Sequence, residues 1–202
     1  MSKETGYESA VNLAVEQLQR IDLISRCSIL GLPEPRNGSL SFRAFGLPMI
    51  LNLDDFQVFH EGTEKPVKIA DRILILHYLL CPGPIHHVES SSELITFRQL
   101  DSGMFYLEAF LSRSIRPLVS RIGNDLEMLR KNLNRFDWEP VAIGDIGARI
   151  HALGKVYVTL SYQSGDDEFP PEARILFEPS IKTIYPTEDV AVLAGRICFG
   201  LC

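Results

Sequence analysis

The sequence predicts an α+β fold, in which a mainly antiparallel sheet is flanked by helices. Segments of alternating apolar and polar residues follow one another through short connections, which suit antiparallel strands better than parallel ones. Apolar residues at helical spacing mark the segments before, between and after these strands. A chain of 202 residues fits one domain, at roughly 150 residues per domain. We therefore expect a single domain over residues 1–202, with an N-terminal helix and connector at 1–38 and the main body at 39–202.

The first half of the chain predicts an amphipathic helix, three strands and a central helix. Residues 7–24 place apolar side chains on one helical stripe, and the Gly- and Pro-rich stretch 31–38 ends this helix. Residues 67–80 are apolar nearly all round, which predicts a helix in the centre of the fold. Alternation predicts short strands at 40–44, 49–53 and 57–60.

The second half predicts a divided helical region, a hairpin and a C-terminal helix. Residues 104–136 are helical in pieces, with Pro117 in the first turn of one helix and Asn124 as the N-cap of the last. Strict alternation over 148–162 predicts a β-hairpin. Thr187 is the expected cap of the C-terminal helix. Further strands are expected at 94–98 and 174–177.

Charge and composition exclude several classes of protein. The net charge is −6 and the pI about 5.4, which is the opposite of the basic footprint that nucleic-acid binding requires. No stretch approaches the roughly 20 apolar residues of a membrane span, and the N-terminus lacks the features of a secretory signal. We therefore expect a cytoplasmic protein that binds neither nucleic acid nor membrane. Its cysteines are then reduced thiols, namely Cys27, Cys81, Cys198 and Cys202.

Five strings of the chain stand out as a group. They are LHYLL (76–80), ITFRQLDSGMFYLEAF (95–110), RPLVSRIG (116–123), GDDEFPPEARILFEPSI (165–181) and YPTEDVAVL (185–193). In this order they resemble an uncharacterised family, domain of unknown function 3786. The resemblance covers most of the chain from about Leu40 onward.

The resemblance implies a protein of anaerobic bacteria or archaea with no assigned reaction. Some relatives look like fusions to a small cysteine-rich iron–sulfur domain of the kind seen in corrinoid and one-carbon proteins, which implies an iron–sulfur or corrinoid partner. This sequence has no such domain, because its cysteines lack the close CxxC-type spacing. It also departs from the family pattern at Glu178, where Asp is expected, and at the His86-His87 pair.

An anion-binding surface is the leading hypothesis for a site. Residues 113–135 hold six basic residues against two acidic ones, and arginine binds phosphate or carboxylate through two parallel donors. Nearby aromatic residues would add a stacking wall. The alternative is that this stretch and the acidic stretch 165–189 are solvated and pair within one fold. The predicted ligand-binding residues are Arg98, Tyr106, Phe110, Arg113 and Arg116.

Three residue types give further candidates. Cys81, His86 and His87 lie close together and are of types that bind zinc, but a structural zinc site needs a second ligand pair, so we expect an exposed loop. His77 lies in the most apolar predicted helix, where a satisfied core histidine is expected and a general base is the alternative. Glu168, in an acidic loop, is the other acid–base candidate.

These observations leave three functional hypotheses. The sequence contains no P-loop, GxGxxG, HExxH or GxSxG motif, so the usual nucleotide, metalloprotease and hydrolase chemistries are unsupported. The first hypothesis is a non-catalytic binding or accessory module in anaerobic metabolism, which recognises an anionic small molecule, a cofactor, or an iron–sulfur or corrinoid protein. The second is an enzyme with His77 or Glu168 beside the arginines. The third is a homo-oligomer, whose mark is an exposed apolar patch. No particular cofactor is indicated.

Overall fold

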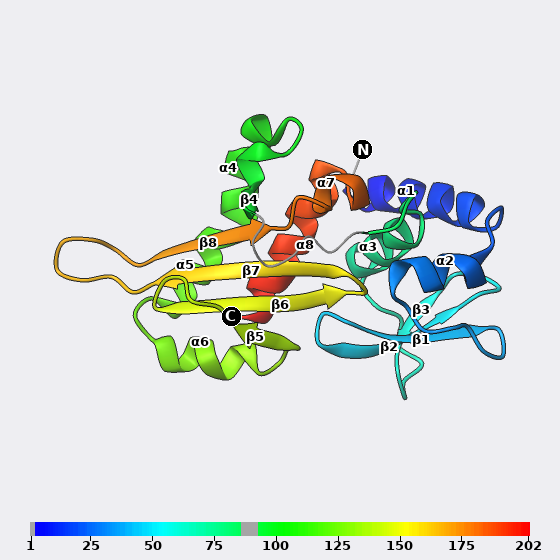
Figure 1. Ribbon diagram of the computed structural model, residues 1–202, viewed down its shortest axis with the longest axis horizontal. Coiled ribbons are helices and arrows are strands. Elements are labelled where there is room, and N and C mark those ends of the chain that lie inside the picture. Colours follow the sequence, from blue (N-terminus) through cyan, green and yellow to red (C-terminus); the bar gives the residue numbers. More distant parts are fainter. Residues whose placement is uncertain (1–2, 86–92) are drawn as a thin grey trace.

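The computed structural model describes residues 3–85 and 93–202, and it confirms the predicted α+β class (Figure 1). The described strands form one antiparallel sheet in the order β3-β2-β1-β6-β7-β8-β4, with β5 paired to β6. The strands are β1 (Ser39–Ala44), β2 (Leu47–Asn52), β3 (Val58–His60), β4 (Ile95–Thr96), β5 (Trp138–Pro140), β6 (Ile146–Leu153), β7 (Val156–Gln163) and β8 (Glu172–Phe177).

Helices pack mainly against one face of this sheet, and α8 crosses behind β6 and β7 in Figure 1. Along β6, buried residues alternate with half-buried ones, as expected for a strand with one face on the core and the other toward solvent. The helices are α1 (Lys3–Leu18), α2 (Leu23–Leu30), α3 (Ile69–Leu79), α4 (Gly103–Arg113), α5 (Ile115–Ile122), α6 (Leu126–Leu133), α7 (Ile181–Ile184) and α8 (Thr187–Gly200).

Tyr78 on α3 connects three parts of the fold. Its side chain is fully buried, and its hydroxyl donates to the Leu30 carbonyl at 2.5 Å while accepting from the Lys155 amide at 2.8 Å. Gly154 makes this approach feasible, because a Cβ there would lie 2.3 Å from the Tyr78 hydroxyl oxygen. The Lys155 ammonium donates to the Ile29 carbonyl at 3.0 Å. The end of α2, the last turn of α3 and the turn between β6 and β7 thus meet at one hydroxyl group.

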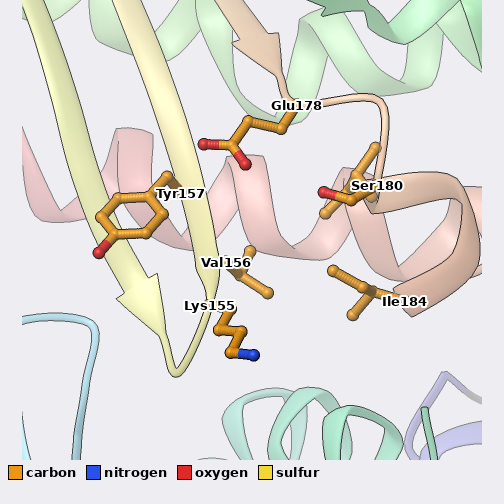
Figure 2. Close-up of a pocket in the computed structure, with 7 residues that line it drawn as sticks. Lys155, Val156, Tyr157, Glu178, Ser180 and Ile184 are labelled. Carbon is orange, nitrogen blue, oxygen red and sulfur yellow. The ribbon is translucent and has the colours of Figure 1, made fainter. Parts of the chain in front are cut away.

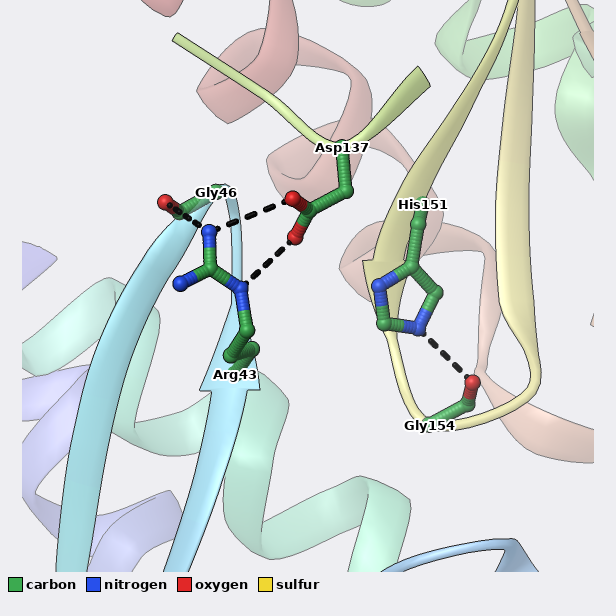
Figure 3. Close-up of polar contacts among 5 residues, drawn as sticks. All are labelled: Arg43, Gly46, Asp137, His151 and Gly154. Carbon is green, nitrogen blue, oxygen red and sulfur yellow. Dashed lines mark hydrogen bonds and ion pairs between the residues drawn. The ribbon is translucent and has the colours of Figure 1, made fainter. Parts of the chain in front are cut away.

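The sheet is continuous but narrow at one point. Strand β1 pairs with β2 along its whole length, yet it pairs with β6 only through Ala44 and Leu153. Contacts beside this point strengthen the junction (Figure 3). Arg43 donates to both oxygens of Asp137, at 2.9 and 3.2 Å, and to the Gly46 carbonyl at 3.0 Å. Asp137 in turn accepts through its carbonyl from the His151 amide at 2.8 Å.

Several elements lie where the sequence predicts them. The central helix, the three-stranded meander and the hairpin of β6 and β7 are all present. Pro117 lies in the first turn of α5, as predicted. The predicted strand at 94–98 is shorter, because after Thr96 the chain turns into the 3-10 segment η1 (Phe97–Gln99). The predicted loop at 81–92 is described only as far as Ile85, so its later part lies outside the described residues.

Three local predictions about helix ends were wrong. The helix expected over 7–24 is divided, because the Asp22 carboxylate accepts from the Ile24 amide at 3.1 Å and begins α2. The N-cap of α6 is Asp125 rather than Asn124, whose side-chain amide instead pairs with the backbone of Gly165. Thr187 is the first residue of α8 rather than its cap, and its hydroxyl donates to the Asp101 carbonyl at 2.7 Å.

No helix within the described residues is long and apolar enough to cross a membrane.

The Tyr78 contact predicts a measurable loss of stability. In Tyr78→Phe the Leu30 carbonyl and the Lys155 amide lose their shared partner inside the core, which costs about 1–3 kcal/mol of unfolding free energy. Urea denaturation followed by circular dichroism measures this difference. Tyr106→Phe removes an exposed hydroxyl and should leave the midpoint unchanged. Equal midpoints for wild type and Tyr78→Phe would contradict the role given to this hydroxyl.

Candidate functional site

The start of α4 is held in a fixed position by the segment before it. Ser102 adopts φ 59°, in the left-handed region that residues other than glycine rarely occupy. Gly103 follows, and a Cβ there would lie 2.1 Å from the Phe97 carbonyl oxygen. The rings of Phe97 and Phe110 stack with their centroids 4.1 Å apart. The chain therefore enters α4 through a narrowly defined turn over a buried aromatic pair.

Three consecutive apolar side chains in the first turn of α4 face solvent. Met104, Phe105 and Tyr106 are 62%, 89% and 59% exposed, and we refer to them as the α4 surface. Exposed apolar residues are ordinary when single, whereas adjacent ones mark interaction sites. In Figure 1, α4 projects beyond the β8 edge of the sheet, on the side opposite α6.

The predicted ligand-binding residues are spread over η1, α4 and the start of α5, and one of them is buried. Tyr106 belongs to the α4 surface, and Arg98 is exposed on η1. Arg113 and Arg116 are exposed on either side of the junction between α4 and α5, where Arg116 donates to Glu108 at 2.8 Å. Phe110 is buried, with its ring against Phe97, so the surrounding core already occupies the stacking face expected for a ligand.

His77, the histidine of the central helix, is paired with a buried carboxylate. Its Nδ1 lies 2.5 Å from Oδ2 of Asp189 in the first turn of α8, with side chains 27% and 8% exposed. Because a carboxylate accepts, Nδ1 carries the proton, and within the described part of the chain Nε2 has no hydrogen-bond partner. This arrangement fits the satisfied histidine expected from the sequence, and it also orients the ring as a general base requires.

Other polar groups lie near this pair. The pKa of Tyr7 on α1 is raised, first by burial and then by the negative charges of Glu188 and Asp189, while Arg113 acts in the opposite direction.

Glu168, the second acid–base candidate, lies in the loop between β7 and β8, where its amide donates to Asp166 at 2.9 Å. That loop is at the far end of the sheet from α3 in Figure 1, so the two candidates do not share a site.

The solvent-facing side of the sheet carries a charged cluster that sequence reasoning missed. Arg149 on β6 donates to Glu139 at 2.7 Å and to Glu178 at 2.8 Å, and its guanidinium lies 3.5 Å from the centre of the Tyr157 ring. His151 lies beside Tyr157 and donates from Nε2 to the Gly154 carbonyl at 2.8 Å (Figure 3). The alternation of polar residues in the predicted hairpin was the available signal, but it could not show which distant carboxylates pair with Arg149.

Two shallow grooves lie on this part of the molecule. Figure 2 shows the first, between the start of β7 and the segment that leads into α7, with an empty volume of about 160 Å³. Its lining includes Lys155, Tyr157, Glu178 and Ser180. The second, with an empty volume of about 540 Å³, is lined by Gly144, Ser161, Gln163, Glu172 and Arg174. None of the sequence-predicted site residues lines either groove.

The described cysteine, histidine and carboxylate residues form no group of three or more that could hold a metal ion. Cys81 is buried, with its thiol directed at the Thr183 carbonyl at 3.7 Å. The other two metal candidates, His86 and His87, lie outside the described residues. Burial raises the pKa of the thiols of Cys27, to about 11, and of Cys198.

The family model of a domain of unknown function, DUF3786, matches residues 22–199. The chain therefore belongs to this uncharacterised family, as its sequence strings suggest. The match begins at Asp22, so it includes α2 and all the described strands, while α1 precedes it. No curated protein and no solved structure gave a significant match.

The cysteines should differ in their reactivity. The thiolate is the reactive form, and burial raises the pKa of Cys198 strongly, whereas Arg121 and Arg135 partly oppose the effect of burial on Cys202. At pH 8, iodoacetamide should therefore modify Cys202 before Cys27 and modify Cys198 last. Peptide mass mapping of the native chain measures the order. Modification of Cys198 as fast as Cys202 would contradict the burial of Cys198 within α8.

Proposed function

We propose that this protein is a non-catalytic binding module that docks an acidic partner protein on the α4 surface. The observation that carries the proposal is the exposure of three adjacent apolar side chains, Met104, Phe105 and Tyr106, on a helix with a fixed start. Aromatic residues dominate the binding energy of protein interfaces. A contact group that is already held in place loses less entropy when the partner binds.

Charge supports an acidic partner. Residues 97–122 contain four arginines against Asp101 and Glu108, so this segment is positive on a chain of net charge −6. Arg98 is exposed on η1, before α4, and Arg113 and Arg116 are exposed at the other end of α4, where Arg116 pairs with Glu108. In the proposal these arginines contact carboxylates at the rim of the interface, where charge sets orientation and association rate. The same charges disfavour a symmetrical contact between two α4 surfaces, because a twofold axis would bring arginines toward arginines.

The class of partner follows from the shape of the surface. A projecting, highly exposed Phe105 suits a partner with an apolar pocket and acidic residues around it. The family resemblance makes iron–sulfur and corrinoid proteins of anaerobic metabolism the first partners to test. An anionic small molecule or cofactor held by the arginines is the other candidate, but the burial of Phe110 favours a protein, because it removes half of the expected stacking wall.

Removing the exposed ring should weaken partner binding. With a purified partner, Phe105→Ala should raise Kd at least tenfold, since a central aromatic contact costs about 2 kcal/mol or more when truncated. Arg98→Ala and Arg116→Ala should raise Kd less and reduce its dependence on salt. Isothermal titration calorimetry measures all three. Leu13→Ala, which truncates another exposed apolar residue on α1, is the matched control and should bind as wild type does.

Identification of the partner uses the same variants. The full chain is used as bait, and the partner is the protein that wild type and Leu13→Ala retain and Phe105→Ala loses. Unchanged Kd in Phe105→Ala would refute the α4 surface as the docking site. Native mass spectrometry of protein prepared without oxygen tests the other occupants. A retained anion that is lost in Arg98→Ala, or a dimer that is lost in Phe105→Ala, would replace the partner protein by a small molecule or by a second copy.

The hydrogen bond between His77 and Asp189 favours an enzyme as the second candidate function, with His77 as general base. His77→Asn separates this function from a structural one, because the asparagine amide can still donate to Asp189 while the basic Nε2 is lost. An enzyme of this kind should lose at least about 100-fold in rate in His77→Asn. A non-catalytic module has no such activity to lose, so any turnover that depends on Nε2 would overturn the first proposal.

A further inference from the structure

A short series of contacts connects His77 on α3 to the start of α4. The His77 Nδ1–H group donates to Asp189 at 2.5 Å, and Asp189 lies two residues after Thr187 in the first turn of α8. The Thr187 hydroxyl donates to the Asp101 carbonyl at 2.7 Å. Asp101 immediately precedes Ser102 and Gly103, where α4 begins. Each step of the series is a hydrogen bond or a separation of one or two residues.

The Thr187 hydroxyl has a particular position in this series. Among the described residues, it makes the one side-chain hydrogen bond between α8 and the segment 97–113, which carries the α4 surface. That segment contains the left-handed Ser102 and the closely packed Gly103, so its backbone has few alternative conformations while Asp101 is held. A shift of the first turn of α8 would therefore act directly on the start of α4.

Among the described residues, two side-chain contacts join α8 itself to α3, and only one of them lies near Thr187. A further hydrogen bond, from the Tyr185 hydroxyl to the Leu74 carbonyl of α3 at 2.9 Å, holds the residue before the cap of α8. The His77–Asp189 pair is in the first turn of α8. In the second contact, Nε of Arg196 lies 3.1 Å from each oxygen of the buried Asp71, seven residues further along α8. Seven residues correspond to about 10 Å of helix. The first contact can therefore position Thr187 in a way that the second cannot.

We propose that His77 is a positioning residue for the α4 surface: by holding Asp189 it fixes the first turn of α8, and Thr187 transmits this position to Asp101. The effect of this positioning role on partner binding rests on the function proposed above. His77 itself makes no contact with the partner. Changes at His77 should loosen the start of α4 without removing any exposed side chain, and so weaken docking indirectly.

Hydrogen exchange of the full chain, read by mass spectrometry, tests this proposal. The exchange ratio is the exchange rate of the amides of residues 103–110 divided by that of the amides of β7. In His77→Ala and in Thr187→Val this ratio should rise at least tenfold. The double variant should add nothing further, because both changes break the same series. His77→Asn restores a donor toward Asp189 and should return the ratio to near wild type. Asp71→Asn is the matched control, since it weakens the other α3–α8 contact and should leave the ratio unchanged.

Two results would overturn the positioning role. The first is an unchanged exchange ratio in Thr187→Val, a variant that introduces no buried charge and keeps the test decisive if His77→Ala does not fold. The second is an equal rise in Asp71→Asn, which would show a general loosening of α8. Failure of the docking proposal is seen separately. If Phe105→Ala binds as wild type while the exchange ratios change as expected, the positioning role stands and the docking site is wrong.

Discussion

The hydrogen bonds of the Tyr78 hydroxyl to the Leu30 carbonyl and the Lys155 amide are the constraint on which the remaining arrangement depends. They fix the turn between β6 and β7 against the central helix, at the point where β1 joins β6 through a single residue pair. Burial raises the pKa of Tyr78, so the hydroxyl is protonated and able to donate at neutral pH. The contacts of Arg43 with Asp137 act on the same junction from its other side.

The position of α4 depends on a series of contacts that begins at the central helix α3. The central helix α3 holds α8 through Asp71 and His77, and α8 holds the start of α4 through Thr187. The aromatic pair of Phe97 and Phe110 closes the other side of α4. The exposed positions of α4 are Glu108, Ser112 and Arg113 along the helix and three apolar residues in its first turn. In a chain with no use for the contact, polar residues would be expected there, because exposed apolar groups promote aggregation.

The elements that could be predicted from the sequence are those determined by local pattern. Alternation and helical spacing predicted the meander, the central helix and the hairpin, because these patterns report burial directly. Helix ends were less predictable where two adjacent residues are both able to cap, as with Asn124 and Asp125, since the choice depends on the contact of Asn124 with Gly165. The site was predictable in part: Tyr106 and the arginines lie at the surface, but the burial of Phe110 depends on Phe97, across a turn that the sequence does not define.

The two candidate binding surfaces differ in the interactions that a ligand would have to replace. On the open face of the sheet, Arg149 already pairs with Glu139 and Glu178 and covers the Tyr157 ring. A ligand there must replace interactions of equal strength, so its net gain is small. At the α4 surface, a ligand has few existing interactions to replace. Phe105 has almost no contacts to lose, and burying a side chain of this size is worth about 1.5–3 kcal/mol. The surface with unsatisfied apolar area, and not the one with the most charged groups, is therefore where binding has the most to gain.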